Sequence, residues 1–371
     1  MMLLPWRPAT GATATERIEA LKLLFEHLDE TAWRCASSLL PQPHDVGTPF
    51  VRPSWRDWGK DAVVTGPPSD YWPFQEQLID LLLKHVGLHG RRWQALLEVA
   101  PELCKKHADL GAKVLAALRA LDPAQLARDD ALVLGDAARE LVMRHENMHE
   151  ADWSLKGEAI KRFKELRDHL TPRLRRDRER WLFVHWPEVL REYDLSIEER
   201  WQQLSGQRSE AVTAVIREEG FNALLDWAEE VEQPESLGGT LAALSLSPED
   251  EQLLLKHAFA SVGTIANRPS SARLGCGYIA VKGKSATADW LKITADNLQR
   301  DFGSQSVAYF IQALPCNKGT WAFLDTRDEE VQGAYWQQTW LTMLPLDECE
   351  IAVTRLLAAN RPFKEIDLIA L

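Results

Sequence analysis

The chain has 371 residues, of which 45% are apolar and 26% charged, a composition typical of a folded protein with one large or two to three medium domains. It excludes disorder and collagen-like repetition. The formal net charge of −12 predicts that the molecule as a whole repels nucleic acid. No stretch reaches the roughly 18 uncharged apolar residues of a membrane span, and the first eight residues lack the pattern of a signal peptide. We expect a cytoplasmic protein that does not enter a membrane.

Two residue types stand out in the composition. The five cysteines are widely spaced and form no CxxC pair, which favours reduced thiols over a disulfide framework or a zinc ribbon. The chain contains 15 Trp against 11 Phe and 5 Tyr, so it is rich in tryptophan. This surplus calls for an explanation from the fold or from a binding surface.

The first helix is marked by a capping box in which Thr13 precedes Glu16, followed by apolar residues at three- and four-residue spacing. The pattern continues through Trp33 to Leu40. Residues 41–69 then contain six prolines and little periodicity, which predicts a long irregular loop. Helical spacing resumes from Asp70 and predicts helices up to Leu121, each ending at Gly, Pro or Asp.

The same pattern predicts helices through the rest of the chain. Ser196 with Glu199 forms a second capping box, and Ser247 followed by Pro248 provides a cap and a first-turn proline. The expected helices are 131–148, 155–169, 174–184, 197–219, 221–231, 235–244, 248–262, 270–282, 286–302, 304–313, 330–343, 347–358 and 362–370. The only strand-like run, Tyr278 to Val281, is too short to build a sheet.

These helices, about 10 to 20 residues long with short connections, predict an all-α fold and specifically an α-solenoid of stacked helical hairpins. A compact bundle is the alternative. We expect an N-terminal helical domain over 1–150 that carries the loop 41–69, middle repeats over 151–262 and C-terminal repeats over 263–371. The apolar residues that run up to Leu371 lead us to expect that the natural protein continues beyond it.

One motif could carry zinc chemistry. His145-Glu146-Asn147-Met148-His149 matches H-E-x-x-H, in which two histidines one helical turn apart bind Zn²⁺ and the glutamate activates the bound water. A zinc metallopeptidase with His145 and His149 as ligands and Glu146 as general base is therefore the alternative function.

The context of this motif favours a structural role. Charged Glu150 follows the second histidine directly, and the third-ligand candidates, Glu165 and Asp168, lie in a basic helix that we expect to be solvated. The structural interpretation places His145 on the partly buried face that starts at Leu134 and runs to Met148. Both histidines would then form hydrogen bonds near a helix C-terminus, where positive charge is favourable.

Two further stretches suggest function and are better explained structurally. Gly283-Lys284-Ser285 resembles the end of a P-loop, but position 278 is Tyr where the motif needs glycine. We expect instead a helix that ends at Lys282, a left-handed cap at Gly283 and a new helix opened by Ser285. Lys161 to Arg180 holds nine basic and four acidic residues. It is the only basic patch, and its interspersed acids indicate a solvated helix rather than a nucleic-acid site.

Several segments resemble the helical-repeat region of large bacterial multidomain proteins that carry an NTPase or effector domain elsewhere and serve in defence or signalling. The segments are residues 48–58 (TPFVRPSWRDW), 151–155 (ADWSL), 334–336 (AYW) and 356–362 (LLAANRP). The resemblance implies an α-solenoid that binds protein partners or senses a ligand and has no active site. Such proteins are usually far longer, so this chain is either a fragment or a free-standing adaptor.

We therefore expect a non-enzymatic helical scaffold or sensor that binds a protein partner and needs no cofactor. The candidate contact residues are Arg52, Trp55, Arg56 and Trp58 in the proline-rich loop, because Trp and Arg dominate interface hot spots. An equally good interpretation folds this loop onto its own domain. Among the other tryptophans, Trp6 also lies outside a helix, and one set should pack between helices. That set comprises Trp33, Trp72, Trp93, Trp181, Trp201, Trp227, Trp290 and Trp336, with Trp186 also expected in the core.

Overall fold

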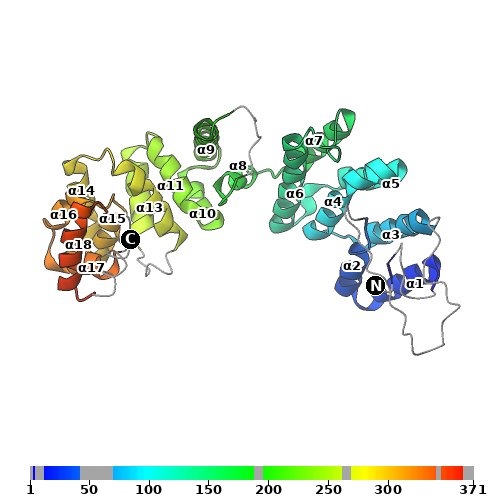
Figure 1. Ribbon diagram of the computed structural model, residues 1–371, viewed down its shortest axis with the longest axis horizontal. Coiled ribbons are helices and arrows are strands. Elements are labelled where there is room, and N and C mark those ends of the chain that lie inside the picture. Colours follow the sequence, from blue (N-terminus) through cyan, green and yellow to red (C-terminus); the bar gives the residue numbers. More distant parts are fainter. Residues whose placement is uncertain are drawn as a thin grey trace. The chain divides into compact units, whose positions relative to one another are not determined.

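The computed structural model describes residues 3–4, 12–41, 70–187, 195–260, 269–339 and 344–361. These residues form 18 α-helices and two short 3₁₀ helices and contain no β-strand (Figure 1), so the predicted all-α fold is confirmed. None of the described helices combines the length and apolar character that a bilayer crossing requires. None of the five cysteines forms a disulfide bond. The chain divides into two compact units, residues 1–173 and 174–371.

The first unit is built from seven α-helices that pack mainly on their neighbours in the sequence. α4 lies against α5 and α6, and α6 lies against α7, while α1 contacts α2 and α3. One apolar core runs through the unit, from Ile18 on α1 to Leu170 at the end of α7. The helices are α1 (Ala14–His27), α2 (Asp29–Ser37), α3 (Tyr71–His85), α4 (Gly90–Lys106), α5 (Ala108–Ala120), α6 (Arg128–Asn147) and α7 (Glu158–Leu170).

The second unit has eleven α-helices and a core of its own. The largest fully buried side chains of this core include Trp227, Phe259, Tyr309 and Phe310. α9 contacts α8, α10 and α11, and α15 contacts α14 and α17. The helices are α8 (Arg175–Glu179), α9 (Ile197–Glu219), α10 (Phe221–Glu230), α11 (Pro234–Ala243), α12 (Pro248–Phe259), α13 (Ser270–Lys282), α14 (Ala288–Phe302), α15 (Ser304–Gln312), α16 (Lys318–Leu324), α17 (Glu329–Gln338) and α18 (Leu346–Ala358).

The predicted helix starts agree with the structure where local side chains cap them. At α1 the Glu16 backbone N–H donates to Thr13 Oγ1 at 3.2 Å, and the Thr13 N–H donates to the Glu16 carboxylate at 2.7 Å. Ser196 and Glu199 form the same reciprocal pair at α9. These bonds satisfy backbone groups that the first helical turn leaves unpaired.

The structure departs from the predicted elements around residues 283 and 318. Gly283 has φ −62°, so it is not a left-handed cap, and the helix after it is capped by Thr287 rather than opened by Ser285. The segment 318–324, which is not among the expected helices, forms α16, whose cap Asn317 accepts the Thr320 N–H at 3.0 Å. With seven residues including a glycine, α16 is too short to show helical periodicity. The predicted helix 362–370 lies outside the described residues.

The expected domain boundaries at 150 and 262 differ from the observed division between residues 173 and 174. α7 follows residue 150, yet its buried Phe163, Leu166 and Leu170 belong to the core of the first unit. Likewise, buried residues on both sides of 262, such as Phe259 and Leu274, share the core of the second unit. Helix periodicity does not reveal which neighbouring helices share a core.

In the second unit α11 and α13 approach each other closely enough for their backbones to touch. A Cβ atom added at Gly238 would overlap the Leu274 carbonyl oxygen, and one added at Gly277 would overlap the carbonyl oxygen of Glu235. Each helix therefore presents a glycine where the other presents backbone. Beside this contact the Arg273 guanidinium donates to both carboxylate oxygens of Glu235, at 2.6 and 2.8 Å, in the two-pronged geometry that fixes orientation as well as distance.

Gly238→Ala tests this contact. We expect it to lower the free energy of unfolding of the second unit by about 2–3 kcal/mol, because the added methyl group has no space between two backbones. Gly239→Ala is the matched control, since its Cβ would lie 3.6 Å from Val281 Cγ2, an ordinary contact. It should be neutral or stabilise by about 0.5–1 kcal/mol through helix propensity. Urea denaturation of both variants measures the difference, and equal effects would contradict the close approach.

Candidate functional site

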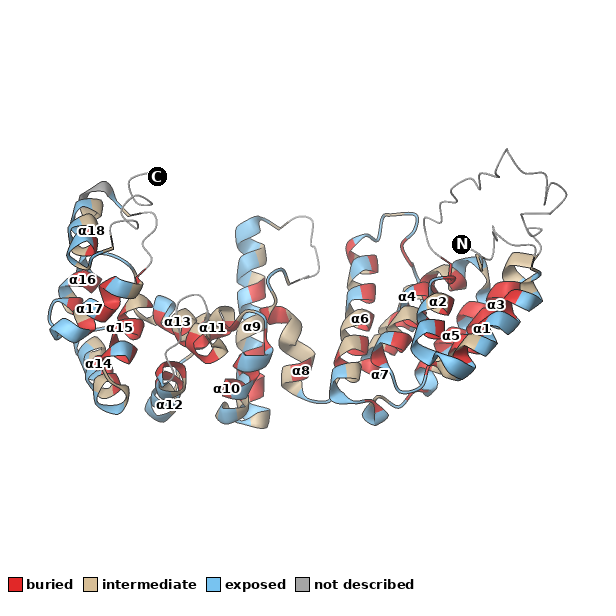
Figure 2. Ribbon diagram, turned by 90° about the horizontal axis from the view of Figure 1, so that it is seen from below, coloured by how far each residue is buried: buried red, intermediate tan, exposed pale blue. Residues whose placement is uncertain are grey.

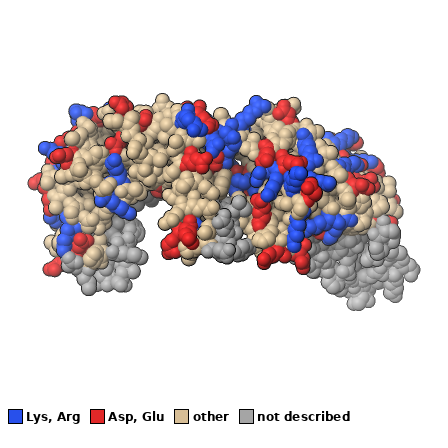
Figure 3. Space-filling view, turned by 90° about the horizontal axis from the view of Figure 1, so that it is seen from above, with Lys and Arg blue, Asp and Glu red and all other residues tan. Residues whose placement is uncertain are grey.

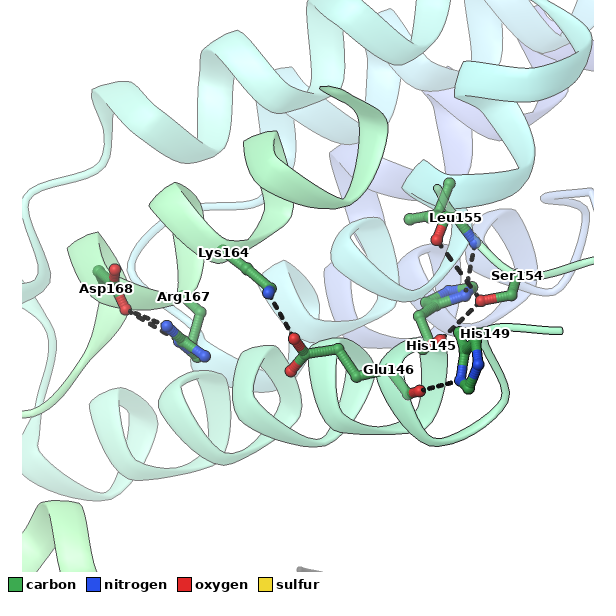
Figure 4. A network of polar contacts seen from close by, with 8 residues as sticks. All are labelled: His145, Glu146, His149, Ser154, Leu155, Lys164, Arg167 and Asp168. Carbon is green, nitrogen blue, oxygen red and sulfur yellow. Dashed lines mark hydrogen bonds and ion pairs between the residues drawn. The ribbon is translucent and has the colours of Figure 1, made fainter. Parts of the chain in front are cut away.

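The four loop residues expected to contact a partner, Arg52, Trp55, Arg56 and Trp58, lie outside the described residues. The other candidate site, the H-E-x-x-H motif, is fully described. It lies at the carboxyl end of α6 and in the turn that leads to α7 (Figure 4). α6 ends at Asn147, so His149 follows the helix instead of continuing it. The expected placement of both histidines on one helical face is therefore not realised.

His145 is buried and forms part of the structural framework of this turn. Its ring Nδ1 accepts the backbone N–H of Leu155 at 3.1 Å, and its carbonyl oxygen accepts a bond from Ser154 Oγ at 2.6 Å. The Trp153 ring lies beside the imidazole with 5.3 Å between centroids. The predicted buried face from Leu134 to His145 is confirmed, whereas Met148 is exposed. His145 thus fastens the segment before α7 to the end of α6.

Burial, together with the nearby positive charges of Arg144 and Lys105, lowers the pKa of His145 from 6.5 to about 4. The ring is therefore neutral at pH 7. The expectation that a positive charge is favoured at this helix C-terminus is wrong for His145, because the cost of desolvating the imidazolium outweighs the helix dipole. With Nδ1 accepting a hydrogen bond, the proton of the neutral ring sits on Nε2, and neither nitrogen has a free lone pair for a metal.

The other members of the motif have partners of their own. Glu146 forms an ion pair with Lys164 of α7, and Figure 4 shows its side chain extended toward that lysine. His149 Nδ1 lies 3.3 Å from the Glu146 carbonyl oxygen, which agrees with the expected hydrogen bond near the helix end.

The two residues considered as a third ligand are also engaged. Glu165 lies 3.7 Å from Arg119, and Asp168 accepts from Arg167 at 2.7 Å. Within the described ranges no group of three His, Cys, Asp or Glu side chains converges as metal ligands would. The residues around the motif do not fit a zinc site.

In the basic stretch 161–180, many Lys and Arg side chains are paired with acidic side chains. The pair Arg175–Glu179 has the expected i,i+4 spacing, whereas several other partners come from other helices. Figure 3 shows acidic and basic side chains intermixed on the face it presents. The ion pairs of this stretch include Lys161–Glu158, Lys164–Glu146, Glu165–Arg119, Arg167–Asp168, Arg175–Glu179, Arg176–Glu219 and Arg178–Glu218.

The tryptophans divide differently from the expected sets. Most of those expected between helices are buried or half-buried, but Trp201 on α9 is 55% exposed and Trp186 is 78% exposed. Both were expected in the core, and the structure corrects this. Trp6 lies outside the described residues together with the two loop tryptophans. Large exposed indoles are a typical feature of interaction surfaces.

Trp201 belongs to an apolar stripe that extends beyond the core of its unit. Ile197, Trp201, Leu204 and Val212 lie on one face of α9 at three-, four- and eight-residue spacing. Val212 and Leu204 are buried, whereas Ile197 is 68% exposed, and the first turns of α9 are largely exposed in Figure 2. Periodicity identifies this stripe in the sequence, but it cannot show where neighbouring helices stop covering it.

We expect the purified protein to hold much less than one zinc per chain after incubation with zinc chloride and gel filtration, and His149→Ala to leave that content unchanged. The reason is that His145 and Glu146 are committed to other contacts. Elemental analysis of both proteins measures this. One equivalent of zinc that disappears in His149→Ala would contradict the structural interpretation.

The His145 pKa predicts a pH-dependent stability. The unfolded state takes up a proton near pH 6.5 and the folded state only near pH 4, so stability is full above about pH 6.5 and falls as the pH drops toward 4, by about 3 kcal/mol in total. In His145→Asn an amide oxygen can accept the Leu155 N–H and does not titrate. Urea denaturation at several pH values should therefore show this acid-induced loss in the wild type and less of it in the variant. Identical pH profiles would disprove the assignment.

Comparison with known proteins adds no relative to these observations. No protein-family model, curated protein or solved structure matches the chain.

Proposed function

We propose that the chain is a non-enzymatic helical scaffold that binds a protein partner, as part of a bacterial defence or signalling system. The observation that carries the proposal is the exposed continuation of the α9 stripe, Ile197 and Trp201. Exposing two large apolar side chains side by side on a helix costs solubility and gives the monomer nothing in return. A partner that covers them gains the burial free energy and a tryptophan anchor.

The contacts of the H-E-x-x-H motif support the non-enzymatic part of the proposal. A general base must be available to a water molecule or substrate. Glu146 is instead paired with Lys164, and His145 accepts a backbone N–H. Both residues act in joining α6 to the segment that follows it.

The arrangement of helices within each unit supports an α-solenoid as the finer fold. In the first unit α4 packs on α5 and α6, and α7 packs on α5 and α6. Contacts between nearest and next-nearest helices are what stacked hairpins produce. The five cysteines form no disulfide bond, which supports a reducing compartment, and the proposed location is the cytoplasm.

Trp201→Ala tests the proposed function. We expect a partner captured from cells that naturally make the protein to bind the variant about 30-fold more weakly in a titration with the purified partner, the loss typical of a tryptophan anchor. Trp153→Ala is the matched control, because Trp153 is also about half exposed but lies in the other unit. Thermal denaturation should show that both variants fold. Equal affinity of the wild type and Trp201→Ala would contradict the proposal, as would an equal loss in the control.

A further inference from the structure

A groove lies between α12 and α14 in the second unit. The Trp290 indole N–H donates to Glu251 at 3.3 Å near the amino ends of the two helices, and Lys256 pairs with Asp301 at 3.3 Å near their carboxyl ends. Because residue numbers increase in the same direction along both helices, α12 and α14 run parallel. The groove between them follows several turns of each helix.

The groove has an apolar floor and one prominent apolar wall. Its volume is about 260 Å³. Leu255 and Leu298 are buried beneath it, while Ile293 on its edge is 60% exposed. The lining residues recur at helical spacing and are Pro248, Glu251, Gln252, Leu255, Lys256, Trp290, Ile293, Thr294, Asn297, Leu298 and Asp301.

The Trp290 side chain, which forms one wall of the groove, is held in place before any ligand binds. Glu251 accepts bonds from both the Trp290 indole and the Tyr278 hydroxyl of α13, and Lys282 lies 3.7 Å from the same carboxylate. Trp290 also packs against Phe310, with 6.0 Å between ring centroids. A preformed wall reduces the entropy lost on binding.

The charges at one end of the groove indicate the polarity of its ligand. Glu249, Asp250 and Glu251 lie in the first turn of α12, and Asp289 lies in the first turn of α14. Lys282 is the cation that faces this group in the ion pair with Glu251. The second unit as a whole has 20 Lys and Arg against 30 Asp and Glu, a net charge of −10. This end of the groove therefore attracts basic side chains.

We infer that the groove binds an amphipathic α-helix of the partner protein, lying antiparallel to α12 and α14 with a basic carboxyl-terminal turn. A helix of three to four turns matches the length of the groove and can place an apolar ridge on Leu255, Ile293 and Leu298. In this orientation its basic turn lies at the amino ends of α12 and α14, whose first turns carry Glu249, Asp250 and Asp289, and its own dipole also favours basic residues there. The inference rests on the proposed function and specifies the class of partner.

Three fluorescein-labelled synthetic helices of about four turns test the groove by fluorescence anisotropy. The first has a leucine ridge and two arginines in its last turn, the second replaces the arginines with glutamates, and the third replaces the leucines with serines. We expect the first peptide to bind with micromolar affinity and the other two at least about tenfold more weakly. Equal affinity of the first and third peptides overturns the groove inference, because binding would then depend on charge alone.

Ile293→Glu places a charge on the edge of the groove at an exposed position. It should weaken binding of the first peptide about tenfold or more. Leu253→Glu is the matched control, since Leu253 is also exposed on α12 but does not line the groove, and it should bind like the wild type. Equal loss in both variants overturns the inference.

Binding of the natural partner to Ile293→Glu and to Trp201→Ala distinguishes failure of this inference from failure of the proposed function. A partner released by Ile293→Glu as well as by Trp201→Ala supports both. A partner released by Trp201→Ala but bound at wild-type affinity by Ile293→Glu overturns the groove inference and leaves the scaffold function standing. A partner that binds both variants as tightly as the wild type overturns both.

Discussion

The second unit depends on the backbone contact between α11 and α13. Two helices that meet through glycines approach more closely than side chains permit, so their separation is set by main-chain atoms. α13 then fixes much of what surrounds it. Gly275 packs against Ala258 and Phe259 of α12, and the Tyr278 hydroxyl reaches Glu251 of the same helix. The position of α12, and through it one side of the groove, follows from this contact.

Local features of the sequence predict the helices well. Capping residues such as Thr13, Ser196 and Ser247 act within one turn of their own helix, so their effect is visible without the fold. α16 is not predicted from the sequence, because it is short and is stabilised by long-range packing. This packing includes the contact between Trp321 and Trp336, whose ring centroids lie 5.8 Å apart. The boundary between the two units is likewise a property of contacts distant in sequence, which no local pattern contains.

The candidate sites likewise depend on contacts with residues that the local sequence pattern does not reveal. The H-E-x-x-H motif suggests two zinc ligands and a general base. The zinc-site interpretation and the structural interpretation differ only in what surrounds these side chains. The contacts with the Leu155 N–H and Lys164 favour the structural interpretation, and neither residue belongs to the motif. Conversely, the sequence places Trp201 and Leu204 on one apolar stripe but gives no sign that one is exposed and the other buried. Burial of a helical stripe depends on the neighbours of the helix.

The uncovered part of the α9 stripe also bears on how much of this protein a cell should make. Ile197 and Trp201 offer the same apolar surface to any molecule that meets them, including another copy of the chain. If a partner covers this surface as proposed, copies in excess of that partner leave the surface exposed, and the rate at which they meet one another rises with the square of their concentration. Matched dosage of the two proteins, or synthesis of both from one transcript, keeps that excess small.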